Sequence, residues 1–280
     1  MGVVMRRVAW VVEYEGSAFV GWQRQKNGVS VQGALEGALA RHVGVPIAVT
    51  AAGRTDSGVH ATGQVVHADV PARLPVGALG PGLNRWLPEG VKVRALRQVP
   101  GSFDARRSAV SRTYRYRILD TVAPSPLRLQ RVWWVKHPLD DEAMMAAATC
   151  FQGMRDWSAV RAAGCAATHP VRDIHWTRPV RCGDEIEVEV RANAFLYHMV
   201  RNMVAGLVAV GQGKLSVAQM AALLEARRRE DWPPTAPAQG LALERVGYPA
   251  ARLGDLPEFR WGEDRLWAVD PDQEPRKEPS

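Results

Sequence analysis

Two short segments alternate between apolar and charged residues, and this alternation constrains the fold more than any other sequence feature. In 113–119 aromatic and aliphatic side chains alternate with arginines, and in 185–191 aliphatic side chains alternate with glutamates. A period of two residues is the pattern of a β-strand with one buried face. Both segments are therefore predicted to be strands, and the chain must build at least one sheet.

Helical and strand patterns intermingle along the rest of the chain. Further strands are expected at 8–14, 47–51, 64–70, 91–99, 132–136 and 174–179. Helices are expected at 30–41 behind an N-cap serine, 140–150, 196–210 and 216–230, the last opening with a capping box. Because strands often follow one another without a helix between, an α+β fold with antiparallel or mixed sheets is favoured over a doubly wound one.

A seam near 100–112 separates two such sets of elements. The expected organisation is an N-terminal α+β domain over 1–106, a second α+β domain over 107–249, and an acidic, proline-rich tail over 250–280 that is partly disordered. The interval 74–87 is ambiguous, because Gly80, Pro81 and Gly82 interrupt any helix there.

Charge is distributed unevenly between the body and the tail. The formal net charge is +7, but 251–280 holds 5 basic and 8 acidic residues, which leaves +10 on the body. A basic folded body favours a polyanionic partner, most often a nucleic acid, although general solubility explains the same balance.

The cysteines and apolar runs place the chain in the cytoplasm. Cys150, Cys165 and Cys182 are odd in number and form no Cys-x-x-Cys pair, which is typical of reduced thiols. The cysteines, with His169 and His175, match no zinc spacing, so no metal site is predicted. No apolar run is long enough for a membrane span or a signal peptide. No dinucleotide fingerprint occurs, and no cofactor is expected.

The segment 51–64 concentrates chemistry-bearing residues in a glycine-rich stretch between two predicted strands. It holds Arg54, Asp56 and His60. A guanidinium two residues away favours the ionised form of a carboxylate, which can then act as a nucleophile or a base. The alternative is a structural aspartate that binds the backbone amides of its own turn.

This segment resembles the catalytic motif of the tRNA pseudouridine synthase A family, Gly-Arg-Thr-Asp-x-Gly-Val-His. Further stretches match the family in the same order, at 14–23, 31–36, 103–106, 114–116, 193–202 and 235–241. The resemblance covers roughly residues 6–249.

The resemblance implies two similar α+β halves whose sheets join around a central RNA-binding cleft, in a homodimer. It implies isomerisation of uridine to pseudouridine at nucleotides 38, 39 and 40 of the tRNA anticodon stem-loop, without cofactor or metal. Asp56 would be the nucleophile, attacking either C1′ of the ribose or C6 of the uracil.

The same resemblance assigns roles to further residues. Tyr114 would stack on the uracil, Arg201 would pair with Asp56, and Leu241 would line the pocket. Arg54 would support the flipped nucleotide, since a base within a stem must be extruded to be reached. Weaker candidates for RNA contact complete the set: His60, Gln64, Arg106 and Arg115. The choice of Tyr114 over Tyr116 rests on resemblance alone.

Two other functions remain open from the sequence. One is a non-catalytic tRNA-binding or folding module, against which the presence of Asp56, Tyr114 and Arg201 argues. The other is a carboxylate-dependent hydrolase acting on a nucleoside or glycoside. That chemistry normally uses a second carboxylic acid, and none accompanies Asp56 within its loop.

Overall fold

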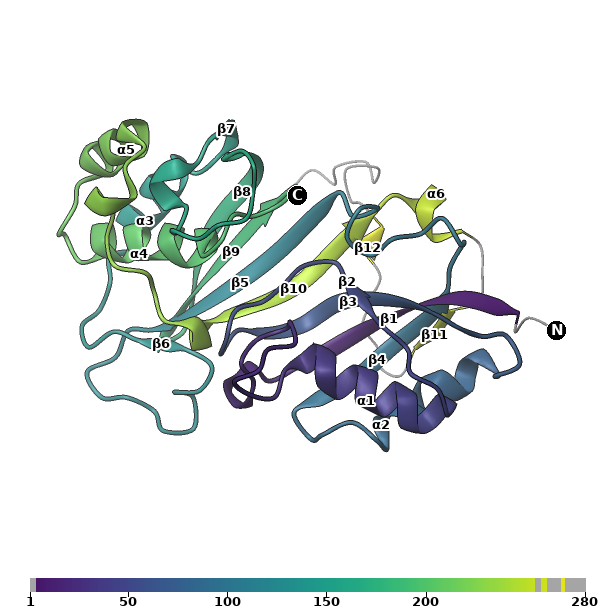
Figure 1. Ribbon diagram of the computed structural model, residues 1–280. Helices are drawn as coiled ribbons and strands as arrows, with labels where there is room; N and C mark the ends of the chain where they lie inside the picture. Colours follow the sequence, from purple (N-terminus) through teal and green to yellow (C-terminus); the bar gives the residue numbers. More distant parts are fainter. Residues whose placement is uncertain (1–3, 255–257, 261–267, 270–280) are drawn as a thin grey trace, which may run out of the picture. The chain divides into compact units, whose positions relative to one another are not determined.

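A computed structural model of the chain describes residues 4–254, 258–260 and 268–269 (Figure 1). The chain divides into two compact units, here called unit 1 (Met1–Ser111 with Leu243–Ser280) and unit 2 (Arg112–Ala242). The predicted domains ended at 106 and 249. The chain instead returns to unit 1 at Leu243, because the strand that follows lies beside a strand of that unit.

Unit 1 is built on one sheet. Its strands are β1 (Met5–Tyr14), β2 (Thr50–Ala51), β3 (His60–Pro71), β4 (Val91–Gln98), β10 (Leu241–Tyr248), β11 (Glu258–Arg260) and β12 (Ala268–Val269). They are ordered β11-β4-β1-β3-β10, with β2 beside β3 and β12 beside β10. β1 pairs antiparallel with both neighbours, so that Trp10 lies opposite Val66 on β3 and Leu96 on β4.

Two helices cover one face of this sheet (Figure 1). They are α1 (Val31–Val43) and α2 (Pro81–Asn84), accompanied by the 3₁₀ turns η1 (Gly16–Ala18) and η2 (Val76–Leu79). The predicted N-cap is confirmed, since Ser30 Oγ accepts a hydrogen bond from Gly33 N–H at 3.1 Å. The core between the layers is anchored by Trp10, which is fully buried and donates its indole N–H to Leu79 O at 3.0 Å.

Unit 2 is also built on β-strands. Its strands are β5 (Ser111–Leu119), β6 (Trp133–Trp134), β7 (Gly153–Asp156), β8 (Val171–Cys182) and β9 (Glu185–Ala192). They are ordered β5-β9-β8-β7, with β6 parallel to β5 and the other pairs antiparallel. The alternation in 113–119 and 185–191 is confirmed as two paired strands, in which Tyr114 lies opposite Val190.

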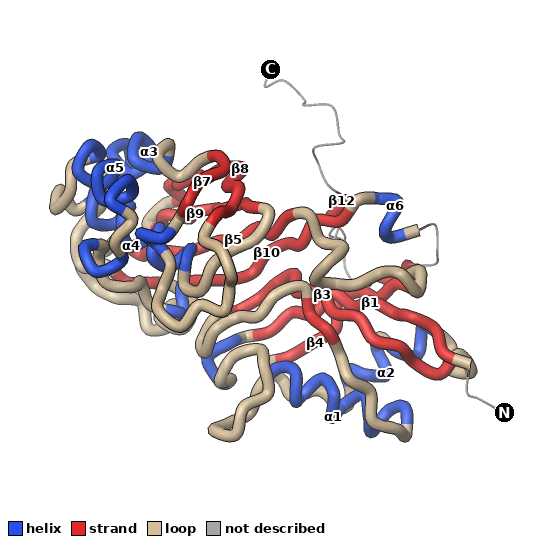
Figure 2. Tube along the Cα trace, turned by 45° about the horizontal axis from the view of Figure 1, so that its top comes forward, coloured by secondary structure: helices blue, strands red, loops and turns tan. Residues whose placement is uncertain are grey.

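Helices again gather on one face of the strands of unit 2, as both views show (Figures 1 and 2). They are α3 (Asp141–Ala148), α4 (Met199–Gly211) and α5 (Val217–Ala226), with the 3₁₀ turns η3 (Ser158–Val160), η4 (Arg229–Asp231) and η5 (Ala238–Gly240). The predicted capping box is confirmed at the start of α5, where the side chains of Ser216 and Gln219 each accept a hydrogen bond from the backbone N–H of the other residue.

Three predicted boundaries differ from the structure for local reasons. The helix expected from 196 begins at Met199, because His198 has a left-handed backbone with φ 57°. The helix expected to reach 230 ends at Ala226, where Arg227 takes the left-handed conformation that commonly ends helices. The strand expected at 47–51 is reduced to two residues.

The predicted tail contributes short ordered elements to unit 1. α6 (Ala250–Leu253) follows β10, β11 pairs antiparallel with β4, and β12 pairs parallel with β10. The remainder of the predicted acidic tail lies outside the described residues. Among the described helices, none combines the length and the apolar character that crossing a membrane demands.

Candidate active site

Asp56 lies in the loop between β2 and β3 of unit 1. Its side chain is half-buried, while Arg54 is exposed. The loop is tight, since Val59 N–H donates to Asp56 O at 3.1 Å and Gly58 adopts φ 79°. The backbone of the catalytic candidate is therefore fixed by its own turn.

Gly21 allows a neighbouring segment to pack against this loop. Its φ is 104°, and a Cβ at this position would lie 2.8 Å from Thr55 O and 3.1 Å from the carbonyl carbon of Asp56. The next residue, Trp22, donates its backbone N–H to Thr55 O at 3.0 Å. Only glycine permits so close an approach together with a positive φ.

Buried polar side chains from β1 and β3 form hydrogen bonds with residues of this loop. Tyr14 Oη lies 2.8 Å from Thr55 Oγ1, and Gln64 Nε2 donates to Gly53 O at 2.8 Å and to Tyr14 Oη at 3.3 Å. Burial raises the pKa of Tyr14 to about 12, although its bonds to Thr55 and Gln64 oppose this shift. These bonds hold the chain on both sides of Arg54.

Two residues predicted to contact RNA are part of this support. Gln64 is fully buried, and His60 is 9% exposed. His60 Nδ1 accepts a hydrogen bond from Gly16 N–H at 3.0 Å and lies 3.3 Å from Glu15 Oε1. The structure therefore places both side chains inside unit 1, where they shape the loop, rather than on its surface.

Arg106 lies on an exposed turn after β4. The carboxylate of Asp104 accepts hydrogen bonds from the backbone N–H groups of Arg106 and Arg107 at 2.9 and 2.8 Å. The turn is tied to the core at Ala105, whose N–H donates to His67 Nδ1 at 3.0 Å. Burial, reinforced by the nearby Arg7, lowers the pKa of His67, which favours the neutral ring that this acceptor role requires. The exposed arginines are thus presented on a rigid turn.

The two tyrosines of β5 have different environments within unit 2. Tyr116 is fully buried and donates to Pro237 O at 2.7 Å, and a Cβ on Gly240 would lie 2.6 Å from its ring. Tyr114 is 8% exposed, and its ring meets that of Phe195 edge-on, with centroids 5.1 Å apart. Tyr116 is therefore a core residue, and burial raises its pKa.

Arg201 lies in the first turn of α4, half-buried, and its Nε donates to Ala236 O at 2.7 Å. The neighbouring Asn202 is fully buried; its Oδ1 accepts from Thr235 Oγ1 at 2.7 Å and from Arg229 at 3.1 Å, and its Nδ2 donates to Val160 O at 2.9 Å. This network fastens the chain between α5 and β10 to α4.

Leu241, the first residue of β10, is 6% exposed.

Arg115, also predicted to contact RNA, is engaged on the sheet of unit 2. Its guanidinium lies 2.9 Å from Glu187 and 3.9 Å from Glu189 on the neighbouring β9.

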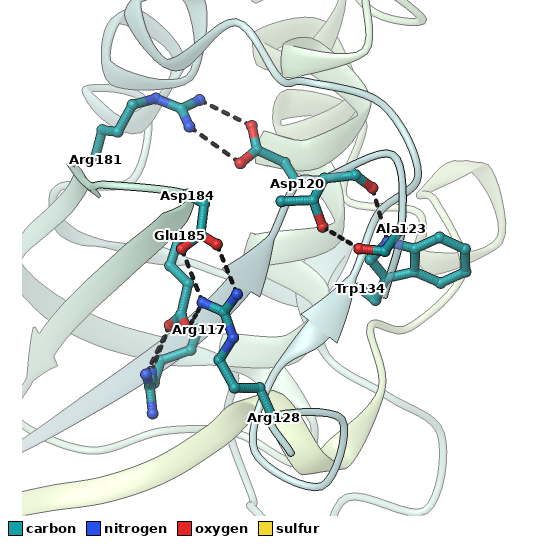
Figure 3. A network of polar contacts seen from close by, with 9 residues as sticks. Arg117, Asp120, Ala123, Arg128, Trp134, Arg181, Asp184 and Glu185 are labelled. Carbon is teal, nitrogen blue, oxygen red and sulfur yellow. Dashed lines mark hydrogen bonds and ion pairs between the residues drawn. The ribbon is translucent and has the colours of Figure 1, made fainter. Parts of the chain in front are cut away.

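Other arginines of unit 2 are also paired with carboxylates (Figure 3). Arg128 forms a bidentate pair with Asp184 at 2.8 and 2.6 Å, and Arg181 one with the buried Asp120 at 3.0 and 2.9 Å. These cations stabilise the loop that follows β5.

Comparison with known proteins gives the chemistry that this arrangement serves. The family model described as tRNA pseudouridine synthase matches residues 10–106 and 147–249. The chain belongs to this family. The Asp56 loop lies in the first matched range and α4 in the second, while Tyr114 falls between them.

Named relatives extend the match over most of the chain. The chain is 47% identical to tRNA pseudouridine synthase A of Paramagnetospirillum magneticum over 88% of its own length and 97% of the relative's. It is 47% identical to the enzyme of that name from Neisseria gonorrhoeae over 88% and 93% of the two lengths, and 43% identical to that of Burkholderia cenocepacia over 95% and 99%. The chain is accordingly an isomerase that converts uridine to pseudouridine.

Other observations concern metals, thiols and residues that the sequence did not single out. Across the described residues, no group of three or more potential ligands is placed to hold a metal ion. The three cysteines form no disulfide there. Sequence reasoning did not give site roles to Gly21, Tyr14 or Asn202. All three stood within motifs that matched the family, but their contacts come from residues distant in sequence.

Proposed function

We propose that this chain isomerises uridine to pseudouridine at positions 38, 39 and 40 of the tRNA anticodon stem-loop, with Asp56 as the nucleophile. The observation that carries the proposal is the fixed geometry of the Asp56 loop. A half-buried carboxylate stands on a turn whose backbone is held by Gly21, Trp22 and the buried Tyr14. A reacting group fixed before the substrate arrives lowers the entropic part of the barrier.

The proposed reaction requires an ionised carboxylate. Asp56 attacks C1′ of the ribose or C6 of the uracil, and the N-glycosidic bond breaks. The base turns, a bond forms between C1′ and C5, and the bond from Asp56 to C1′ or C6 breaks, which regenerates the carboxylate. The C5 proton is lost while N1 gains one. Atoms balance within the nucleotide and water, so the proposal needs no oxidant, cofactor or metal.

Further residues are proposed to serve the same reaction. Tyr114 stacks on the uracil and helps to remove the C5 proton, and this assignment is supported by the engagement of the Tyr116 hydroxyl with Pro237. Arg201 keeps Asp56 ionised, and Leu241 contributes an apolar wall. Arg54 and Arg106, both exposed, bind the RNA backbone.

We also propose that the enzyme is a cytoplasmic homodimer. The proposal rests on the resemblance to its family and on reduced cysteines. Light scattering of the purified chain at micromolar concentration tests the dimer, and a monomeric mass would contradict it.

Tritium release from tRNA that carries [5-³H]uridine tests the reaction, because pseudouridine formation expels the C5 hydrogen. The wild type is expected to release tritium, and Asp56→Ala and Asp56→Asn to lose at least about 1000-fold in rate while still binding tRNA. Asp231→Asn, the same change at an exposed aspartate on η4, serves as the control. A folded wild type that binds unmodified tRNA without release would contradict the enzyme and favour a tRNA-binding module.

A further inference from the structure

Two stacked aromatic rings precede α4 in unit 2. The rings of Tyr197 and His198 lie with centroids 3.8 Å apart and planes 30° from parallel. Tyr197 is 43% exposed, although large hydrophobic side chains are usually withdrawn from solvent. An exposed aromatic face backed by a second ring is the kind of platform on which unpaired RNA bases stack.

The backbone under these rings is strained. His198 has φ 57° at the residue before a helix, where an extended conformation is usual. Among the described residues, the other non-glycine with positive φ is Arg227, which ends α5 in the ordinary left-handed manner. Strain of this kind persists only where surrounding contacts hold it, and it concentrates at functional sites.

A neighbouring loop supplies those contacts. Tyr197 N–H donates to the sulfur of Cys165 at 3.4 Å, and Tyr197 O accepts from Ala162 N–H at 3.1 Å. Burial by itself raises the pKa of the Cys165 thiol, but its bonds with the N–H groups of Tyr197 and Ala167 and with Arg161 outweigh it and lower the pKa below its usual value. The backbone N–H and C=O groups of Tyr197 are thus both hydrogen-bonded, so its ring projects from a fixed backbone.

The charge of these two segments differs from that of the rest of unit 2. Residues 157–172 and 193–203, which these bonds join, contain three arginines and two histidines but no aspartate or glutamate. By contrast, the arginines in Figure 3 are each matched by a carboxylate. Asp156 and Asp173 flank the first segment and are hydrogen-bonded to Ser158 and Asn193, so three arginines face two carboxylates here. The exposed ring, more than the charge, is therefore the feature that suits an unpaired base.

We propose that Tyr197, backed by His198, stacks on an unpaired base of the RNA substrate other than the uridine that is isomerised. This proposal rests on the proposed function, because it takes the substrate to be tRNA. It makes Tyr197 a binding residue that adds affinity and orients the RNA. The ring, and not the hydroxyl group, carries the effect.

The test compares variants that keep or remove the ring. Binding of a fluorescently labelled anticodon stem-loop is measured by anisotropy for wild type, Tyr197→Ala, Tyr197→Leu and Tyr197→Phe. The two variants without an aromatic ring are expected to bind at least about tenfold more weakly, and Tyr197→Phe is expected to restore most of the affinity. Met154→Ala, which truncates a 71% exposed side chain on β7 of the same unit, is expected to bind as the wild type does.

A second readout reports stacking directly. Stem-loops carrying 2-aminopurine at one unpaired position at a time are titrated with each protein, since stacking on an aromatic ring quenches this base. Quenching at one position by the wild type and Tyr197→Phe, lost in Tyr197→Leu, supports the proposal. Equal affinity and equal quenching for wild type and Tyr197→Leu would overturn it, as would a Tyr197→Phe variant as weak as Tyr197→Ala.

The proposed function is judged separately, by tritium release from wild-type enzyme. If the wild type releases tritium while Tyr197→Leu binds and quenches like it, only the stacking proposal fails. If the wild type releases none, the proposed reaction fails whatever the binding shows.

Discussion

The Asp56 loop of unit 1 and the segment before α4 in unit 2 are held in place by different means. The loop is a turn supported from beneath by hydroxyl and amide groups on strands, with Gly21 against its backbone. The second segment is held by the bonds of Tyr197 to Cys165 and Ala162, and the helix α4 that follows it is tied to Val160 by the buried amide of Asn202. The proposed nucleophile would need the exact placement that the loop provides, whereas the proposed RNA-binding residues would need the firm platform that the helix provides.

The largest effect is expected from Gly21→Ala. The added methyl group would meet the backbone of Thr55 and Asp56 at a φ of 104°, so the loop must shift. We expect the rate constant for tritium release at saturating tRNA to fall about 100-fold or more, because displacement of a reacting group by about 1 Å costs that much.

The matched control for this change is Gly37→Ala on α1, where nothing lies within 4 Å of the new Cβ. It should retain the wild-type rate and gain about 1 kcal/mol in free energy of unfolding, since alanine favours a helix over glycine. A Gly21→Ala enzyme with wild-type activity would show that the loop is not held by this contact.

Asn202→Ala tests the second region. The substitution removes the buried amide group that binds Val160 O, Thr235 Oγ1 and the guanidinium of Arg229. We expect the free energy of unfolding, measured with urea, to fall by about 3 kcal/mol. The same truncation at the exposed Asn27 should change it by less than about 0.5 kcal/mol. Equal stability of the two variants would mean that Asn202 does not fasten this segment.

Tyr14→Phe has the smallest effect at neutral pH, about 1 to 2 kcal/mol, because the buried hydrogen bonds of its hydroxyl with Thr55 and Gln64 are lost. Its effect at high pH has the opposite sign. Folding raises the pKa of Tyr14 from 10.0 to about 12, so its contribution is complete below pH 10 and is lost as the pH rises through 12. Across that window the wild type should lose about 3 kcal/mol that the variant keeps.

Urea midpoints measured for both proteins between pH 8 and about 11.5 check this prediction. The buried Tyr116 is present in both and cancels in the difference. Parallel pH profiles for the two proteins would mean that Tyr14 is not buried as the structure has it.

The sequence predicted the elements whose signal is local. Alternation located β5 and β9, and side-chain caps located the starts of α1 and α5. It failed where tertiary contacts decide. The short strand β7 has too few residues for a readable period, and the return of β10 to unit 1 depends on pairing with β3.

The candidate site shows the same division. Asp56 is singled out by the match of its segment to a family motif, because from the residues alone a structural aspartate in a turn remains open, and the structure adds how that turn is held. The burial of His60 and Gln64 was not predicted. A histidine or glutamine in a sequence gives no signal that distinguishes a side chain facing RNA from one facing the core. The left-handed backbone conformation of His198 could not be predicted either, because no glycine or asparagine marks that position.

The pairing of β11 with β4 has a consequence for the solubility of the protein. β4 would otherwise be the outermost strand of unit 1. The side chain of Asn84 binds the N–H and C=O groups of Val93, but the outward-facing groups at 95–97 would be open to an extended peptide. Residues 258–260 pair with this stretch in the antiparallel sense. The C-terminal segment thus shields an aggregation-prone edge, and a chain shortened before residue 258 would offer that edge to its own copies.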